Sequence, residues 1–283
     1  LELPLLARQR DRLLNVGTIP VVSSPAVVDL CFDKWSTFQF LRQIGVPTPQ
    51  TFVAIEDARA ALFRKELAFP LVVKPRWGTA SFGIEYPESI QELALTWDLG
   101  RLRLLRSFLA SASADGERCL IVQEKGGGTE YGLDVINDLE GRYVTTFVKR
   151  KLAMRSGETD KAVTVAHPVL EAVGRRIGEA LGHIGNLDCD VFVDGDRCWV
   201  LELNPRFGGG YPFTHRAGAN LPAALIAWAQ GEAVDPHWLT IKPDVASAKC
   251  DRLVEIAVDR PANAWSAVAT PNLSGFCWKE ATP

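Results

Sequence analysis

The sequence predicts an α+β protein built from two lobes, and three observations support this fold class. Helical and strand patterns are mixed along the chain, without the strict strand–helix–strand alternation of a parallel α/β sheet. The first half favours helices with short strands, whereas the second half is richer in strands. The 283 residues include 47% hydrophobic and 23% charged side chains. Such a composition supports a sizeable buried core and excludes a disordered or fibrous chain.

Helical patterns dominate the first half. Asp33 is expected to cap a helix that runs to Ile44, because apolar residues recur there at helical spacing and Gly45 follows as a stop. An apolar strand ending at Lys74 leads into a glycine-containing loop over residues 75–83. The elements expected in this half are helices at 7–14, 33–44, 57–65, 89–98 and 102–110 and strands at 19–22, 51–54 and 71–74.

Strand patterns dominate the second half. The elements expected there are strands at 119–124, 131–137, 143–149, 187–194 and 198–204 and helices at 167–184 and 223–230. Residues 150–161 are polar and charged, so we expect a loop there. A glycine run at 208–210 connects the last of these strands to the final helix.

The most informative segment is the hairpin of residues 187–204. Side chains alternate between the two faces of a strand, so Asp188 and Asp190 share a face of the first strand. Glu202 and Asn204 share a face of the returning strand in the same way. A turn of three or five residues would place Asp190 opposite Glu202, whereas a two-residue turn would put them on opposite faces. The longer turns would also place Asp188 opposite Asn204.

Two carboxylates and an amide that converge in this way favour a cation between them. Oxygen ligands select a hard ion, and a small number of protein ligands suits Mg²⁺, which keeps waters and takes phosphate oxygens. Arg206 follows closely and would lie beside the metal, where it could neutralise a transferred phosphoryl group. The alternative is a half-exposed hairpin whose polar face is merely solvated.

Two lysines and a glycine loop suggest phosphate binding. Lys74 ends an apolar strand, and Gly78 and Gly83 allow the loop that follows to fold closely over phosphate groups. The segment is neither a P-loop nor a G-x-G-x-x-G motif, and a tight hairpin turn explains it equally well. Lys34, at the start of a predicted helix, could reach a phosphate or simply be solvated.

A second strand end offers groups to a nucleoside. The apolar strand from residue 119 turns polar at Gln123, Glu124 and Lys125, and three glycines separate it from Glu130. Backbone groups at such a strand end can bind a purine edge, and a carboxylate downstream can accept from both ribose hydroxyls. The alternative for Glu130 is a surface acid in a glycine turn.

Composition narrows the classes of partner and location. The chain has 31 Lys and Arg against 34 Asp and Glu residues, a net charge of −3, so we expect no nucleic-acid partner. No apolar run approaches the roughly 20 residues that span a bilayer, so we expect no membrane segment. The six cysteines are scattered, without paired spacing or nearby histidines, which indicates reduced thiols in a cytoplasmic protein.

The order of these motifs resembles the ATP-grasp superfamily, and within it the ligases related to the carbamoyl phosphate synthase large subunit. The similarity extends roughly over residues 30–257. Its most specific parts are the Glu-Leu-Asn-Pro-Arg run at 202–206 and the Phe-Pro-Leu-Val-Val-Lys-Pro run at 69–75. Asp33-Lys34 and the Gly-Val-Pro-Thr-Pro run at 45–49 add to the resemblance.

The resemblance implies an ATP-grasp fold in which two α+β lobes clamp ATP, preceded by the remnant of an N-terminal α/β (pre-ATP-grasp) domain. The implied division is 1–30 for the remnant, 31–118 for the small lobe with its entry helix, 119–257 for the large lobe with the metal site, and 258–283 for a C-terminal tail. Because family members normally carry that first domain complete, we expect that a preceding domain is missing from this chain.

The resemblance also assigns roles. The cofactor-binding residues it implies are Lys34, Lys74, Gly78, Ser81 and Gly83 for the phosphates, Gln123, Glu124 and Lys125 for the adenine, and Glu130 for the ribose. The metal ligands are Asp190, Glu202 and Asn204, for one or two Mg²⁺ or for Mn²⁺ in their place. The catalytic residues are Arg206, Lys74, Arg150 and Arg155, the last two in a flexible loop at 149–161 that shields the reaction from water.

Members of the family phosphorylate a carboxylate with ATP and let an amine attack the acyl phosphate. The expected activity is therefore that of a carboxylate–amine ligase with small-molecule substrates, and a homodimer is one option for its assembly. Phosphoryl transfer needs positioning and charge neutralisation rather than a protein nucleophile. The alternatives are a phosphotransferase that joins nothing and a nucleotide-binding subunit that needs a partner.

Overall fold

The computed structural model describes residues 2–78 and 82–254. The chain divides into two compact units, Leu1–Lys249 and Cys250–Pro283, and all helices and strands named below lie in the first. Of the second unit only residues 250–254 are described, so the tail predicted at 258–283 lies outside the described residues.

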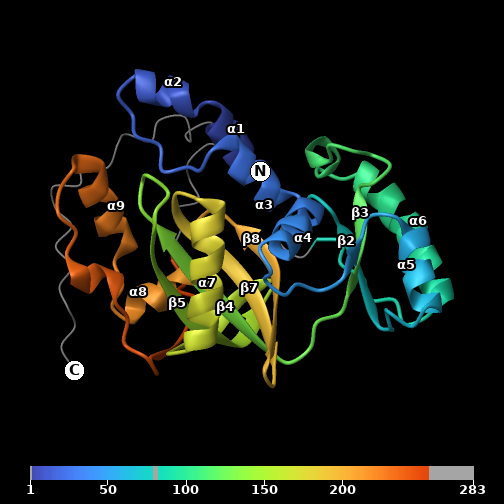
Figure 1. Cartoon of the computed structure of the whole chain (residues 1–283). Helices are drawn as coiled ribbons and strands as arrows, with labels where there is room; N and C mark the ends of the chain where they lie inside the picture. Colours follow the sequence, from blue (N-terminus) through green and yellow to red (C-terminus); the bar gives the residue numbers. More distant parts are fainter. Residues whose placement is uncertain (1, 79–81, 255–283) are drawn as a thin grey trace. The chain divides into compact units, whose positions relative to one another are not determined.

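A three-stranded antiparallel sheet forms the core of the smaller lobe (Figure 1). Its order is β1 (Thr51–Phe52), β3 (Leu120–Glu124), β2 (Leu71–Pro75), and helices α5 (Ile55–Phe63) and α6 (Ile90–Leu105) pack on it. The lobe boundary predicted at residue 118 falls ahead of β3, although β3 pairs with β1 and β2. A 3₁₀ turn, η1 (Ala110–Ala112), follows α6.

A six-stranded antiparallel sheet forms the larger lobe. Its order is β8 (Arg197–Asn204), β7 (Gly185–Asp194), β4 (Thr129–Asn137), β5 (Tyr143–Arg155), β6 (Glu158–Val165), β9 (Ala246–Ala248). The cores on its two faces are separate. Helices α3 (Pro25–Phe32), α4 (Lys34–Gln43) and α7 (Pro168–Leu181) contribute to one, and α8 (Tyr211–Arg216), α9 (Leu221–Gln230) and η2 (Pro236–Leu239) to the other.

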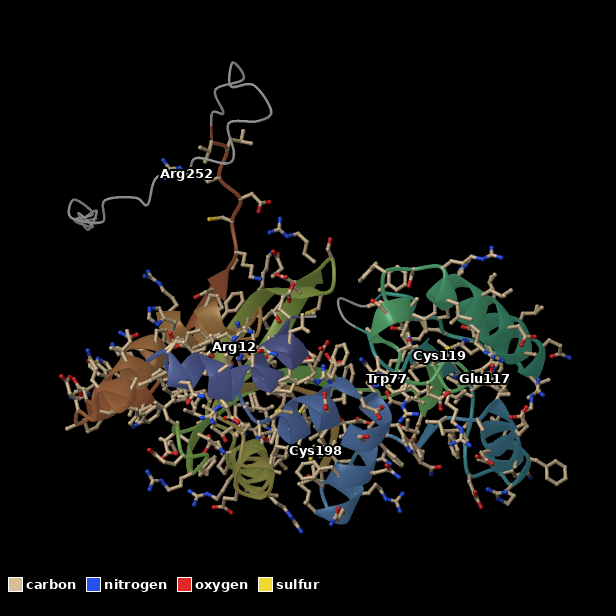
Figure 2. The ribbon with its side chains drawn as sticks, turned by 90° about the horizontal axis from the view of Figure 1, so that it is seen from above. Arg12, Trp77, Glu117, Cys119, Cys198 and Arg252 are labelled. Carbon is tan, nitrogen blue, oxygen red and sulfur yellow. The ribbon has the colours of Figure 1, made fainter. Side chains whose placement is uncertain are left out.

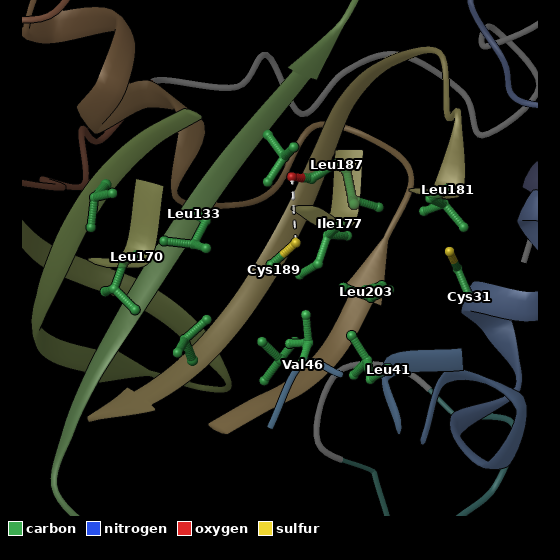
Figure 3. Packing of buried hydrophobic residues seen from close by; sticks show 14 residues of the cluster. Cys31, Leu41, Val46, Leu133, Leu170, Ile177, Leu181, Leu187, Cys189 and Leu203 are labelled. Atoms are coloured by element: carbon green, nitrogen blue, oxygen red, sulfur yellow. Dashed lines mark hydrogen bonds between the residues drawn. The ribbon is translucent and has the colours of Figure 1, made fainter. Parts of the chain in front are cut away.

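The core beneath α7 joins distant parts of the chain (Figure 3). Cys31 from α3 and Leu41 from α4 pack there with Cys189 and Leu203 from the sheet. The Cys189 thiol lies 3.9 Å from the carbonyl oxygen of Leu187. Every cysteine in the described part of the chain is a free thiol, namely Cys31, Cys119, Cys189, Cys198 and Cys250.

Several expected elements differ from the structure. The helix predicted at 7–14 is two short helices, α1 (Leu3–Arg8) and α2 (Arg10–Asn15). The strand predicted at 19–22 is wrong, and Ile19 and Val21 are exposed there without a pairing strand. The helices predicted at 89–98 and 102–110 are the single helix α6, which continues through Gly100.

The loop predicted at 150–161 is also wrong. These residues form the outer part of the hairpin of β5 and β6, with Arg155 paired to Glu158 across its turn. The described part of the chain contains no helix that is long and apolar enough to cross a membrane.

Candidate functional site

The β7–β8 hairpin brings the predicted acidic residues together. Asp190 pairs with Glu202 and Asp188 pairs with Asn204, as the sequence predicts. The sequence predicted this pairing only for a turn of three or five residues, whereas Asp194 pairs with Arg197 and leaves a two-residue turn. A β-bulge after Asp190 offsets the two-residue turn. One extra residue on β8 shifts the register and returns the acidic side chains to a common face.

Glu202 lies among groups that favour its ionised form. The side-chain amide of Asn204 donates to Glu202 Oε1 at 3.2 Å, and Lys34 Nζ lies 3.9 Å from Glu202 Oε2. Although burial opposes ionisation, the positive charges of Lys34 and Lys74 hold the pKa of Glu202 below its usual range. Glu202 is therefore a carboxylate ready to accept a cation.

A second pair of contacts involves Lys151, which the sequence analysis did not select. Its Nζ donates to Glu130 Oε1 and to Asp190 Oδ1, each at 2.6 Å. Burial opposes the charge of this lysine, but Asp190 and Glu130 together raise its pKa above the usual range. Lys151 thus ties the predicted ribose carboxylate to one of the predicted metal carboxylates.

The start of α4 connects to the loop that follows β2. Asp33 caps α4 by accepting from Trp35 N at 3.0 Å, and Arg76 donates to both carboxylate oxygens of Asp33 at 2.6 Å. Lys34 N donates to the carbonyl of Arg76 (3.2 Å), and Lys34 Nζ donates to the carbonyl of Gly78 (2.9 Å). The predicted phosphate lysine is therefore held against the glycine loop.

The loop is also anchored to β3. Arg76 N donates to the carbonyl of Cys119 at 2.9 Å, and the guanidinium of Arg76 lies 4.3 Å from the ring centre of Trp77. Figure 2 shows Trp77 and Cys119 on the same lobe, and both are buried.

Lys74 lies near the end of β2 and is 8% exposed. Burial first, and the charge of Lys34 second, lower the pKa of Lys74 to about 8.

The end of β3 is bonded largely within the protein. The Gln123 side chain donates to Thr51 Oγ1 at 2.9 Å. The backbone N–H of Glu124 donates to the carbonyl of Gln50, and its carboxylate accepts from Gln50 N. Lys125 Nζ lies 5.4 Å from the ring centre of Tyr86. Val72, Ile84, Tyr86, Phe192 and Leu201 line the same cavity as Gln123, Glu124 and Lys125.

These groups line one cavity of about 670 Å³. The predicted site residues on its wall are Lys34, Lys74, Gly78, Gln123, Glu124, Lys125, Glu130, Asp190, Glu202, Asn204 and Arg206. Gly83, Arg150 and Arg155 are not among the residues that line it. Arg155 pairs instead with Asp160 at 3.0 Å. Ser81 lies outside the described residues.

Strand alternation explains which basic residues reach the cavity. Because β5 continues to Arg155, Lys149 and Lys151 share one face of the strand, and both line the cavity. Arg150 lies between them on the other face and is exposed. Residues 147–151 read Phe-Val-Lys-Arg-Lys and carry no apolar alternation, so the polar composition of the segment favoured a loop.

Lys149 belongs to a buried polar cluster at the base of the cavity. Its Nζ donates to Asp134 Oδ2 at 2.6 Å, and the Thr214 hydroxyl donates to the same oxygen. The Asn186 side chain donates to Asp134 Oδ1 (3.2 Å) and to the carbonyl of Arg206 (3.3 Å). Asp134 therefore fixes groups from three elements, β5, β7 and α8, and through Asn186 the backbone that carries Arg206.

The Arg206 side chain is directed by a second carboxylate. Its Nη1 donates to Asp188 Oδ2 at 2.9 Å and to the carbonyl of Phe207 at 3.1 Å. A side chain at position 208 would collide with the Asp188 carboxylate, so this position requires glycine. Asp188 thus fixes the orientation of the Arg206 guanidinium.

The donor set suits a hard divalent ion that is shared with a ligand. Within residues 2–78 and 82–254, no three His, Cys, Asp or Glu side chains are grouped closely enough to hold a metal. Asp190, Glu202 and Asn204 offer two carboxylates and one amide. Mg²⁺ accepts such a small set, because waters and phosphate oxygens complete its octahedral shell.

Comparisons with known proteins place similar sequences and folds beside this chain. Residues 117–250 match a family model described as "ATP-grasp in the biosynthetic pathway with Ter operon". Over 231 residues the chain is 25% identical to the carbamoyl phosphate synthase large chain of Rubrobacter xylanophilus. That match covers 78% of this chain and 20% of the relative.

Solved structures share the fold. The biotin carboxylase domain dimer of Hydrogenobacter thermophilus 2-oxoglutarate carboxylase, in complex with MgADP, ADP and bicarbonate, matches with a TM-score of 0.66 and 18% identity. The match covers 82% of this chain and 52% of that one. The L-amino acid ligase of Bacillus licheniformis matches with a TM-score of 0.59 and 19% identity, over 80% of this chain and 55% of that one. The chain thus spans about half the length of these structures and a fifth of the curated relative.

Proposed function

The chain is an ATP-grasp protein, with the fold that its sequence predicts, and on that premise we propose that it is an ATP- and Mg²⁺-dependent carboxylate–amine ligase. The observation that supports the proposal is an acidic pair that lies beside lysines on the wall of one cavity. Asp190 and Glu202 face each other, and Lys34 lies 3.9 Å from Glu202 with Lys74 nearby. An acidic pair beside buried lysines is the arrangement that a metal-bound polyphosphate needs.

The proposed roles follow from these positions. Lys34, Lys74 and Arg206 bind phosphate oxygens, with Gly78 on the same cavity wall. Asp190, Glu202 and Asn204 hold the metal, which when bound would offset the charge that develops on the phosphate oxygens. The ribose lies at Glu130, and the adenine lies at the end of β3, beside Gln123, Glu124 and Lys125 and next to Val72, which pairs with Gln123 in the sheet.

The reaction then proceeds in two displacements. A carboxylate oxygen of the substrate bonds to the γ-phosphorus as the bond to the bridging oxygen breaks, and ADP leaves with that electron pair. The amine nitrogen next attacks the acyl carbon, phosphate leaves, and the amine loses a proton to solvent. Both steps require orientation, charge neutralisation and exclusion of water rather than a nucleophile from the protein.

The relatives support this class of chemistry. One matched structure is an L-amino acid ligase, and another is a biotin carboxylase domain in complex with MgADP and bicarbonate. We infer small-molecule carboxylate and amine substrates for this chain. Because the chain spans 20% of the carbamoyl phosphate synthase large chain, a second candidate is a phosphotransferase or nucleotide-binding subunit that needs a partner.

Assembly and location are proposals of the same kind. A homodimer is supported by the dimeric biotin carboxylase domain among the matched structures. A reducing compartment such as the cytoplasm is supported by the free thiols of the described cysteines.

Mg-ATP is expected to stabilise the full chain against heat. Ligand at about 100 times its Kd adds roughly 2.7 kcal/mol to the free energy of unfolding. At about 2–4 °C per kcal/mol, the midpoint should rise by roughly 5–10 °C. Differential scanning calorimetry with Mg-ATP, with ATP plus EDTA, and with Mg²⁺ alone makes the measurement. A midpoint that Mg-ATP leaves unchanged would exclude the nucleotide site.

An ADP-release screen of carboxylates crossed with amines distinguishes a ligase from a phosphotransferase.

The efficiency of the enzyme with ATP is expected to fall as the pH rises through about 8. Lys74 has a pKa of about 8, so it carries its charge below that pH and loses the charge above it. A neutral amine attracts phosphate far less strongly, so kcat/KM for ATP should decline with a limiting slope near −1 per pH unit. The profile should be recorded from pH 6.5 to 9.5 at constant ionic strength. A flat profile up to pH 9.5 would contradict a phosphate-binding role for Lys74.

A further inference from the structure

Lys151 occupies a position for which the proposed chemistry gives no role. Its ammonium group lies between Glu130 and Asp190, 2.6 Å from each, and its side chain is 6% exposed. The two carboxylates are about a quarter exposed, because they border the cavity. Lys151 is therefore a buried cation inside the nucleotide site, bonded to one member of the metal pair.

The sheet fixes this arrangement. Glu130, Lys151 and Asp190 come from the adjacent strands β4, β5 and β7. The neighbouring lysine on the same face of β5, Lys149, has its own carboxylate in Asp134 at 2.6 Å. Lys151 differs, because one of its two partners is a residue that the metal also needs.

An ammonium group and a divalent ion compete for the same carboxylate. Two positive charges a few ångströms apart repel each other strongly where water is scarce. With Asp190 engaged by Lys151, a free metal ion would find Glu202, which accepts from Asn204 and lies 3.9 Å from Lys34 Nζ, and the amide oxygen of Asn204. Within the described residues, no group of three acidic, histidine or cysteine side chains offers the metal ion an alternative site.

We propose that Lys151 closes the metal site to free divalent ions and admits the metal only together with the nucleotide. A bound nucleotide would supply the missing ligands and reduce the repulsion. Its phosphates provide further oxygen ligands, and their negative charge offsets the Lys151 ammonium group. Ribose hydroxyls that donate to Glu130 would at the same time replace one bond of Lys151. This inference rests on the proposed nucleotide site and adds an order of binding to it.

The test compares Mn²⁺ binding to the full chain with and without a non-hydrolysable ATP analogue. Free Mn²⁺ is measured by electron paramagnetic resonance for the wild type and for Lys151→Met. Without nucleotide, Lys151→Met should bind Mn²⁺ at least about tenfold more tightly than the wild type. The analogue should strengthen Mn²⁺ binding to the wild type, and this gain should shrink in Lys151→Met, because binding free energies are coupled reciprocally.

Two further variants separate charge from structure. Lys151→Arg keeps the positive charge, so it should bind free Mn²⁺ as weakly as the wild type. Lys161→Met removes a lysine from an exposed position of the adjacent strand β6 and should leave Mn²⁺ binding unchanged. Thermal unfolding checks that each variant is folded, and Lys151→Gln is the second neutral variant if the methionine variant does not fold.

Two results would overturn the inference. Free Mn²⁺ that binds Lys151→Met and Lys151→Gln no more tightly than the wild type would show that the ammonium group does not guard the site. Equal Mn²⁺ affinity of the wild type with and without the analogue, while the analogue binds, would exclude the order of binding. Failure of the wild type to bind the analogue at all would instead overturn the nucleotide site, and the inference with it.

Discussion

Glu202→Gln is expected to lower Mg²⁺-dependent turnover by at least about 100-fold, a loss at the upper end of what the groups around a metal contribute. The charges of Lys34 and Lys74 lower the pKa of Glu202 despite its partial burial, so it would supply a full negative charge to a bound metal. The amide that replaces it has nearly the same shape and no charge. The variant should therefore fold normally but lose metal affinity. Release of ADP as a function of Mg²⁺ concentration gives the measurement.

A matched control for this variant is Glu179→Gln. Glu179 lies on α7, its side chain is 58% exposed, and it pairs with Arg175 at 4.0 Å. The control should keep wild-type turnover and Mg²⁺ dependence. If Glu202→Gln retained full activity at every Mg²⁺ concentration, Glu202 would not be a metal ligand.

Lys149→Met is expected to cost about 3–5 kcal/mol of stability, the usual loss when one member of a buried ion pair is removed. The Lys149 and Asp134 side chains are 1% and 0% exposed, and their charged atoms lie 2.6 Å apart. Without the ammonium group, the Asp134 carboxylate would remain buried with hydrogen bonds from Thr214 and Asn186 but no opposite charge. At about 2–4 °C per kcal/mol, the thermal midpoint should fall by roughly 6–20 °C.

The double variant Lys149→Met with Asp134→Leu distinguishes the ion pair from the volume of the lysine. Replacing both charges with apolar groups removes the buried unpaired carboxylate, so the double variant should recover much of the lost stability. Urea unfolding of the wild type and the single and double variants gives the coupling. A single variant whose midpoint stays within about 2 °C of the wild type would show that Asp134 is satisfied without Lys149.

The acidic hairpin shows how far sequence reasoning reached. Alternation placed Asp190 with Glu202 correctly, because the two strands are clear from their composition. The pairing was expected only for a turn of three or five residues, whereas the turn has two residues and a bulge restores the register. A bulge depends on how the strand packs in three dimensions, and nothing local in the residues near position 201 marks it.

The missed lysines have a different cause. The outer part of β5 lines a polar cavity on one face and is exposed on the other, so it lacks the apolar alternation by which a strand is recognised. The two helices predicted in place of α6 have another cause, which is Gly100. Gly100 indicated a break, yet it is the close approach of Leu120 Cδ1, 3.1 Å from where a Cβ would lie, that favours glycine inside the helix.

One missed element did carry a sequence signal. Helix α3 begins with Ser24 as its N-cap, whose hydroxyl accepts from Val27 N, and with Pro25 in its first turn. Serine followed by proline is a typical helix start. The sequence instead predicted a strand at 19–22, because a short apolar run has the composition of a strand whether or not a partner strand is available.

Helix α4 connects the two sheets mechanically. Leu41 is buried in the core of the larger sheet, whereas Asp33 and Lys34, at the other end of the helix, bond to Arg76 and Gly78 beyond β2. A swing of the smaller sheet would pull on this end of the helix and carry the Lys34 ammonium group with it. Such a movement would change the distance between the Lys34 ammonium group and Glu202, which is 3.9 Å here.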